Sequence, residues 1–154
     1  MSKSYWKRVI GLRIMGLDFG SRTIGVAVSD PLLWTAQGLK TIKRSPAELA
    51  ELAEIIQNYE VTEIVLGYPK NMNGTIGERA EATLKFGKKL QREFSLPIIY
   101  WDERLSTVGA EHSLLEADLS RKKRKRVIDK MAAVFILQGY LDSRKIKEEN
   151  LEPL

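Results

Sequence analysis

Residues 14–30 read IMGLDFGSRTIGVAVSD, and this stretch decides how the rest of the chain is arranged. The apolar run IMGL is too short for a helix of its own, is closed at Gly20, and is followed by a second apolar run, IGVAV. The pattern predicts a β-hairpin. Asp18 stands at the end of its first, buried strand, where aspartate is a poor strand former. We expect this carboxylate to be either a turn former or a ligand.

The composition is that of a soluble globular domain. The chain has 154 residues, of which 44% are hydrophobic and 29% charged, which suits one domain with a substantial core. We expect an extension at 1–12, the domain at 13–143 and a polar tail at 144–154. No stretch resembles a membrane span, and we expect a cytoplasmic protein with no membrane partner. Cysteine is absent and His112 is the single histidine, so any metal would be bound by oxygen.

The excess positive charge is concentrated in one run, residues 121–126, which reads RKKRKR. The net charge is +5, yet the other 19 basic residues are balanced by 20 acidic ones. Such a patch favours binding of a polyanion, although a solvated helix start or a localisation signal has the same pattern. The run consists of Arg121, Lys122, Lys123, Arg124, Lys125 and Arg126.

The order of elements predicts an α/β fold. Ser45 with Glu48, and Thr75 with Glu78, have the spacing of helix-capping pairs. An antiparallel meander of three strands followed by strand–helix–strand crossovers gives a mixed five-stranded sheet flanked by helices. After the hairpin we expect strands at 38–43, 63–67 and 96–102, and helices at 45–56, 75–94, 106–117 and 120–143.

Acidic residues are expected at one edge of this sheet. If the first, fourth and fifth strands run parallel, their carboxyl ends carry Asp18, Gly67 and the pair Asp102–Glu103. Asp129 shares one helix face with small and apolar residues that should pack on the sheet. A buried carboxylate needs a metal or a cation, and pairing with Arg104 or Lys130 is the alternative. The residues of this face are Asp129, Ala132, Ala133, Ile136, Leu137 and Tyr140.

Converging carboxylates without His or Cys suggest hard divalent cations such as Mg²⁺ or Mn²⁺. Two such ions about 4 Å apart can activate a water and stabilise the leaving oxygen in phosphodiester hydrolysis. The basic run would hold the polyanion. Together these features predict a metal-dependent nuclease.

Four segments resemble the signature blocks of the YqgF, or RuvX-like, family of the ribonuclease H-like superfamily. They are DFGSRTIGVAVSD (18–30), VLGYPKNMNG (65–74), DERLST (102–107) and DKMAAVFILQGYL (129–141), and the resemblance covers about residues 14–142. It implies a ribonuclease H-like fold in a bacterial cytoplasmic protein. It also implies a nuclease that matures the 5′ end of the 16S ribosomal RNA precursor, associated with pre-ribosomes, or else a Holliday junction resolvase. The acidic positions of the family fall on Asp18, Glu103 and Asp129.

Other residues near these segments have two readings each. Many ribonuclease H-like enzymes carry an acid where this chain has Gly67, and we expect Glu103 to reach across the space that the glycine leaves. Asp102 is either an outer ligand or a strand end, and Arg104 either binds the scissile phosphate or neutralises the acids. Arg22 and Lys70 lie in loops, where they either contact a phosphate backbone or are exposed cations with no specific role. Trp34 and Tyr68 either stack on bases or belong to the core.

The sequence leaves the substrate open between structured RNA and branched DNA. Junction cleavage needs two active sites and therefore normally a symmetric dimer, and nothing in the sequence specifies a dimer face. Two functions from other classes compete with cleavage. The glycine turn after Asp18 also suits an ATP-binding regulator, and the basic run suits an RNA-binding assembly factor without activity.

Overall fold

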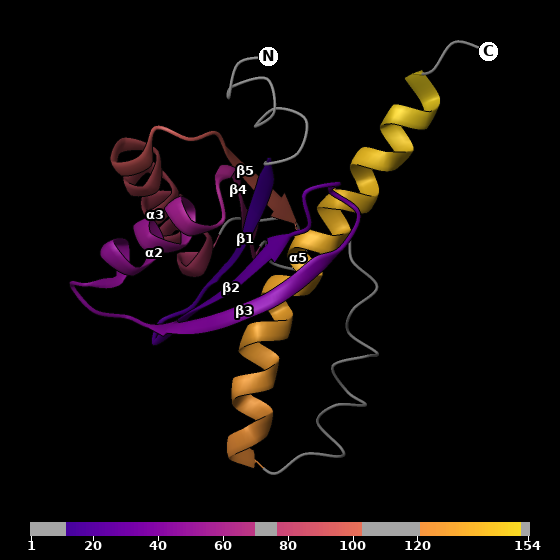
Figure 1. The fold of residues 1–154 in the computed structure, drawn as a ribbon. Coiled ribbons are helices and arrows are strands. Elements are labelled where there is room, and N and C mark those ends of the chain that lie inside the picture. The colour runs from indigo at the N-terminus through magenta and orange to yellow at the C-terminus, as the bar shows by residue number, and fades with distance from the viewer. Residues whose placement is uncertain (1–11, 70–76, 103–120, 152–154) are drawn as a thin grey trace.

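The sheet has the mixed five-stranded architecture that the sequence predicts. A computed structural model describes residues 12–69, 77–102 and 121–151, with side chains of the last helix described for 131–146. The strand order is β3-β2-β1-β4-β5, with β1 antiparallel to β2 and parallel to β4 (Figure 1). The strands are β1 (Arg13–Phe19), β2 (Thr23–Ser29), β3 (Ala36–Lys43), β4 (Val61–Tyr68) and β5 (Ile98–Asp102).

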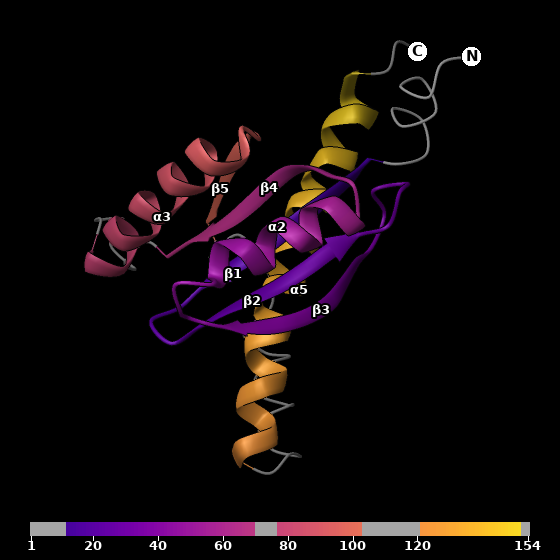
Figure 2. The same ribbon diagram turned by 60° about the vertical axis from the view of Figure 1, so that its left-hand side comes forward.

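Helices cover both faces of this sheet. Helices α2 (Glu48–Asn58) and α3 (Glu78–Phe94) lie on one face, and the long α5 (Arg121–Leu151) crosses the other (Figures 1 and 2). The predicted end of the last helix at residue 143 is wrong, because α5 continues to Leu151. The helix expected at 106–117 lies outside the described residues. Within the described ranges, no helix is long and apolar enough to cross a membrane.

Alternation along β1 sorts its side chains between two hydrophobic cores. Met15 and Leu17 are fully buried among residues of α2 and α3, whereas Ile14 packs with Ala133 and Leu137 of α5. A strand that is buried on both faces reads as a continuous apolar run, as IMGL does. Asp18 continues the alternation and therefore lies on the α5 face.

Helix α5 lies unusually close to β1. A Cβ atom placed on Gly16 would lie 2.6 Å from Cβ of Leu137 and 3.1 Å from the carbonyl oxygen of Ala133. The predicted packing of this helix face on the sheet is confirmed, because Ala133, Ile136 and Leu137 are buried. On the strand side, the absence of a side chain at Gly16 allows the same close approach.

A polar contact joins the C-terminal half of α5 to β4. The hydroxyl of Tyr140 donates a 2.7 Å hydrogen bond to the carboxylate of Glu63, and Arg144 lies 3.5 Å from the same carboxylate. Burial raises the pKa of Tyr140, and the hydrogen bond to Glu63 raises it further. The phenol therefore stays a donor throughout the neutral range.

The predicted capping pairs are wrong at both helix starts. The N-cap of α2 is Ala47, and Ser45 Oγ accepts a 3.1 Å hydrogen bond from the amide of Ala47 instead of capping the helix. The carboxylate of Glu48 turns to Arg44, where a 2.7 Å charge-assisted contact is stronger than a cap bond. The N-cap of α3 is Gly77 rather than Thr75, and glycine is tolerated at that position.

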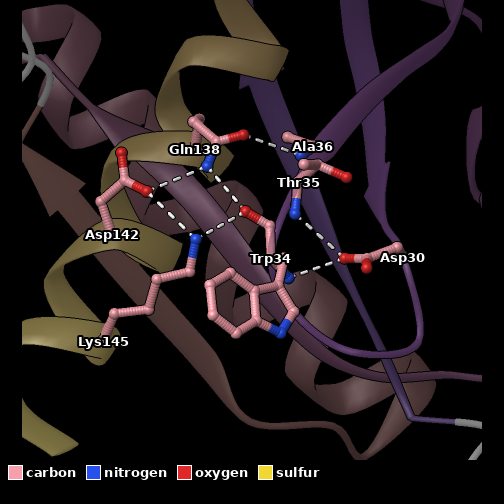
Figure 3. A network of polar contacts seen from close by, with 7 residues as sticks. All are labelled: Asp30, Trp34, Thr35, Ala36, Gln138, Asp142 and Lys145. Atoms are coloured by element: carbon pink, nitrogen blue, oxygen red, sulfur yellow. Dashed lines mark hydrogen bonds and ion pairs between the residues drawn. The ribbon is translucent and has the colours of Figure 1, made fainter. Parts of the chain in front are cut away.

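The loop between β2 and β3 is docked on α5 (Figure 3). Asp30 closes the loop, because its Oδ1 accepts hydrogen bonds from the amides of Trp34 (2.7 Å) and Thr35 (3.0 Å). Burial alone would raise the pKa of Asp30, but these backbone donors outweigh it and lower the pKa. From α5, Gln138 and Lys145 both donate to the carbonyl of Trp34, at 3.0 and 2.9 Å.

Candidate active site at the edge of the sheet

Asp18 lies near the carboxyl end of the central strand β1 with glycines beside it on both neighbouring strands. Gly25 of β2 is its direct antiparallel partner. On β4, Gly67 follows Leu66, the partner of Leu17, and therefore lies alongside Asp18. Asp18 is half-buried, and neither neighbour places a side chain next to its carboxylate. The two adjacent strands therefore contribute only backbone atoms directly beside Asp18.

The backbone of Asp129 lies at the same end of the sheet as Asp18. Leu137 faces Gly16, with the carbonyl oxygen of Ala133 beside it, and Asp129 precedes Leu137 by about two helical turns. In both views α5 and β1 run in opposite directions (Figures 1 and 2). Asp18 follows Gly16 along β1 and Asp129 precedes Leu137 along α5, so both residues lie toward the same end of the sheet. The side chain of Asp129 is outside the described set.

Of the two acids predicted at the end of β5, Asp102 and Glu103, the structure describes the first. Asp102 pairs with Tyr68 on β4, whose side chain lies on the α2 and α3 face, so Asp102 is on the opposite face from Asp18. Trp101, one residue earlier, packs on the α5 side. Glu103, Arg104 and Lys70 lie outside the described residues.

The basic run forms the first turns of α5. The helix begins at Arg121, next to the predicted start at residue 120, and includes all six cations of the run. Their side chains are outside the described set. The expectation that the run opens a helix is confirmed, and its binding role stays a prediction.

Carboxylate oxygens are the ligands that the predicted Mg²⁺ or Mn²⁺ prefers. Of the three expected carboxylates, the described side chains include one, Asp18. Among the described residues, no group of three His, Cys, Asp or Glu side chains could hold a metal ion. Asp18 is a carboxylate beside two glycines, which suits a hard cation such as Mg²⁺. The other two proposed ligands are Glu103 and the side chain of Asp129.

A cavity of about 860 Å³ opens beside the β1–β2 turn, on the face that carries α2 and α3. The turn is closed by a 2.9 Å hydrogen bond from the amide of Gly20 to the carbonyl of Thr23. Two acids line the cavity, Asp18 and Glu48. Five cations line it, namely Arg22, Arg44, Arg79, Lys85 and Lys89. Arg22 is exposed in the turn, as a loop cation near the site was expected to be.

Arg44 holds this turn in place, a role that sequence reasoning missed. Its guanidinium donates to the carbonyl of Gly20 at 2.9 Å and to Glu48 at 2.7 Å. The same group lies 4.4 Å from the centre of the Phe19 ring, which stacks on Phe86 of α3 with ring centroids 4.2 Å apart. The sequence signal was the i, i+4 spacing of Arg44 and Glu48.

The two aromatic residues considered for base stacking have different surroundings. Tyr68 is 8% exposed and packs edge to face against Tyr100, so its assignment to the core is confirmed. Trp34 is 57% exposed, and the ammonium of Lys145 lies 4.5 Å from the centre of its ring. Trp34 is therefore not a core residue.

Comparisons with known proteins agree with this arrangement. A family model described as RuvX, Holliday junction resolvase, matches residues 12–143. A protein of Desulfitobacterium hafniense (strain DSM 10664 / DCB-2) named "Putative pre-16S rRNA nuclease" is 72% identical over 131 residues, which cover 85% of this chain and 92% of that protein. A protein of Bacillus subtilis (strain 168) with the same name is 57% identical over 136 residues, covering 86% and 99%.

Solved structures support the fold. RuvC of T. thermophilus in complex with a Holliday junction substrate superposes with a TM-score of 0.55 at 15% identity, over 93% of this chain and 99% of that one. The ribonuclease H-like fold that the sequence predicts is thereby confirmed. The family match spans all four signature blocks. The chain belongs to the RuvX family.

Proposed function

We propose that this protein is a metal-dependent endonuclease that hydrolyses phosphodiester bonds in structured RNA and matures the 5′ end of the 16S ribosomal RNA precursor. One observation carries the proposal. Asp18 lies at the carboxyl end of the central strand, between two glycines and on the face that α5 covers, in a chain of the RuvX family. The names of its relatives in D. hafniense and B. subtilis support the choice of substrate. Such a role places the protein in the cytoplasm, in contact with pre-ribosomes.

Three carboxylates would hold the metal, namely Asp18, Glu103 and Asp129. The position of Asp129 on α5, one turn before Ala133, supports its inclusion. Glu103 follows Asp102, the last residue of β5, and is included because the acidic positions of the family fall on it. Bound Mg²⁺ or Mn²⁺, as a pair, would supply a water nucleophile at neutral pH and stabilise the leaving oxygen.

Cationic side chains would hold the substrate. We assign this role to the run Arg121–Arg126 and to Arg22, whose exposed side chain lines the cavity that Asp18 also lines. Lys70 and Arg104 are proposed as further phosphate contacts. Asp102 lies on the other face from Asp18, which favours its reading as a strand end.

Cleavage by purified protein tests the proposal. The wild type, Asp18→Asn and the control Glu54→Gln are compared on a precursor 16S RNA fragment with Mg²⁺, Mn²⁺ or chelator. Glu54 is an exposed acid on α2, so the control removes the same charge away from the site. We expect cleavage by the wild type and by Glu54→Gln with either metal, and none by Asp18→Asn. Equal cleavage by Asp18→Asn and the wild type would contradict the proposal.

Holliday junction resolution is the second candidate, and the description of the matching family model favours it. A four-way DNA junction is therefore tested beside the RNA with the same variants. Resolution requires paired cuts, and so predicts a dimer in solution. Binding of RNA that survives Asp18→Asn without cleavage by any variant would indicate an assembly factor, and ATP affinity without cleavage would indicate a regulator.

A further inference from the structure

We propose that the cavity beside the β1–β2 turn is a second nucleic-acid contact, which binds the phosphodiester backbone on the face of the sheet opposite α5. This cationic groove is defined by Arg22, Arg79, Lys85 and Lys89. The proposal rests on the proposed nuclease function and extends it, because the basic run of that function belongs to α5. The groove is a separate surface built from other elements.

Helix α3 supplies one wall of the groove. Arg79, Ala82, Phe86 and Lys89 follow one another at offsets 0, 3, 7 and 10, which places them on one side of the helix, and Lys85 lies next to them. Phe86 is buried against the sheet, whereas Arg79, Lys85 and Lys89 are exposed. Among the described residues, none of these three cations has a carboxylate within ion-pair distance. Their charge is available to an anion.

The β1–β2 turn forms the opposite wall, and Arg44 makes it rigid. Glu48 is buried and neutralises Arg44, so this arginine supports the groove instead of adding charge to it. Its stacking on Phe19, and of Phe19 on Phe86, joins the turn to α3 across the floor of the cavity. A preformed wall lowers the entropy cost of binding a ligand between turn and helix.

The groove begins at the strand end that carries the candidate active site, on the face of the sheet opposite the Asp18 side chain. Asp18 lines the cavity together with Gly20 and Arg22, so the groove opens at the strand end that carries the proposed metal ligand. A strand that presents a phosphodiester to Asp18 would pass around the β1–β2 turn, where Arg22 is exposed, and would then reach the cations of α3. Exposed cations along a groove match the negative charge of a nucleic-acid backbone. Arginine and lysine of this kind give affinity and a dependence on salt.

A thiol footprint tests the location directly, because the chain has no cysteine and a single introduced thiol is unique. Ala82→Cys places a thiol in the groove, and Gln91→Cys places an exposed thiol on α3 outside it. Alkylation rates are measured in chelator with and without an RNA hairpin that carries a single-stranded 5′ extension. We expect the RNA to slow alkylation of Ala82→Cys several-fold and leave Gln91→Cys unchanged. Equal rates for Ala82→Cys with and without RNA would overturn the proposal.

Salt dependence tests the role of the charges. Lys85→Gln/Lys89→Gln removes two groove cations, and Lys88→Gln/Arg92→Gln removes two exposed cations of the same helix outside the groove. We expect the groove variant to flatten the slope of log affinity against log salt by up to about 1.4 for a single strand or about 1.8 for a duplex. The control variant should keep the slope of the wild type. Equal slopes in both variants would overturn the proposal.

The two proposals fail in different ways. If RNA protects Ala82→Cys and the groove and control variants show the expected slopes, but the wild type cleaves nothing with Mg²⁺ or Mn²⁺, the groove stands and the nuclease function falls. If the wild type cleaves and the groove variants behave as the wild type does, the nuclease function stands and the groove falls.

Discussion

The contact between Gly16 and α5 makes a single methyl group a strong perturbation. In Gly16→Ala the new Cβ would lie 2.6 Å from Cβ of Leu137, whereas carbon atoms in contact are about 3.5–4.0 Å apart. Both atoms are tied to backbone, so rotation of a side chain cannot relieve the overlap. Helix α5 must move away from β1 by about 1 Å. Overpacking of this kind costs about 1–3 kcal/mol.

Two measurements follow from this displacement. For a domain of this size, each kcal/mol lowers the unfolding midpoint by about 2–4 °C, and circular dichroism during heating measures it. A misplacement of about 1 Å in an active site costs on the order of a hundredfold in rate. Because α5 carries Asp129, we expect single-turnover cleavage by Gly16→Ala to slow by about that factor. A variant with the midpoint and the cleavage rate of the wild type would refute the reasoning.

Gly87→Ala is the matched control on the other face. Its Cβ would meet the ring of Tyr100, which is 37% exposed and can rotate toward solvent. Alanine is also favoured over glycine in a helix by about 1 kcal/mol, which offsets the remaining strain. We expect a midpoint near that of the wild type and an unchanged cleavage rate, since α3 does not carry the proposed site.

Three further predictions concern other parts of the molecule. Arg44→Gln leaves the buried Glu48 without its cation and should lower the free energy of unfolding by about 1–3 kcal/mol, as urea denaturation would measure. Backbone donors lower the pKa of Asp30 from its usual 3.8. The ionised carboxylate therefore contributes its full stabilisation above that value and loses it as the pH falls through the lowered pKa. The difference in unfolding free energy between the wild type and Asp30→Ala should vanish in acid. Changing three cations of the basic run to Gln should flatten the slope of log affinity against log salt by up to about 0.9 per lost duplex phosphate contact. Turnover at saturating substrate should stay nearly unchanged. An unchanged slope would show that the run is only a solvated helix face. The three are Lys122, Lys123 and Lys125.

The mixed sheet could be predicted from the sequence because each step rests on a local rule. The hairpin around Gly20 fixes β1 beside β2, and crossover helices fix β4 and β5 as parallel strands. The face of α5 that contains Ala133, Ile136 and Leu137 could be read from helical spacing, and these residues are buried. The position of Asp18 at the end of a central strand follows from the same rules.

Features that depend on competition or on distant contacts could not be predicted. Glu48 has the spacing of a capping residue, but Arg44 offers a stronger partner and the helix begins without a side-chain cap. The cationic groove joins the β1–β2 turn to a helix far along the chain, so no local pattern indicates it. The close approach of Gly16 to Leu137 likewise appears only when strand and helix are brought together.

Single-turnover cleavage by the three amide variants tests the central claim most directly. Asp18→Asn, Glu103→Gln, Asp129→Asn and the triple variant are compared on the precursor RNA fragment with saturating Mg²⁺. Ligands of one metal site act as a unit, so losses should be non-additive. We predict that each single variant nearly abolishes cleavage and that the triple is little worse than any single one. Wild-type activity in Asp129→Asn would contradict the account, because α5 would then bring no ligand to Asp18.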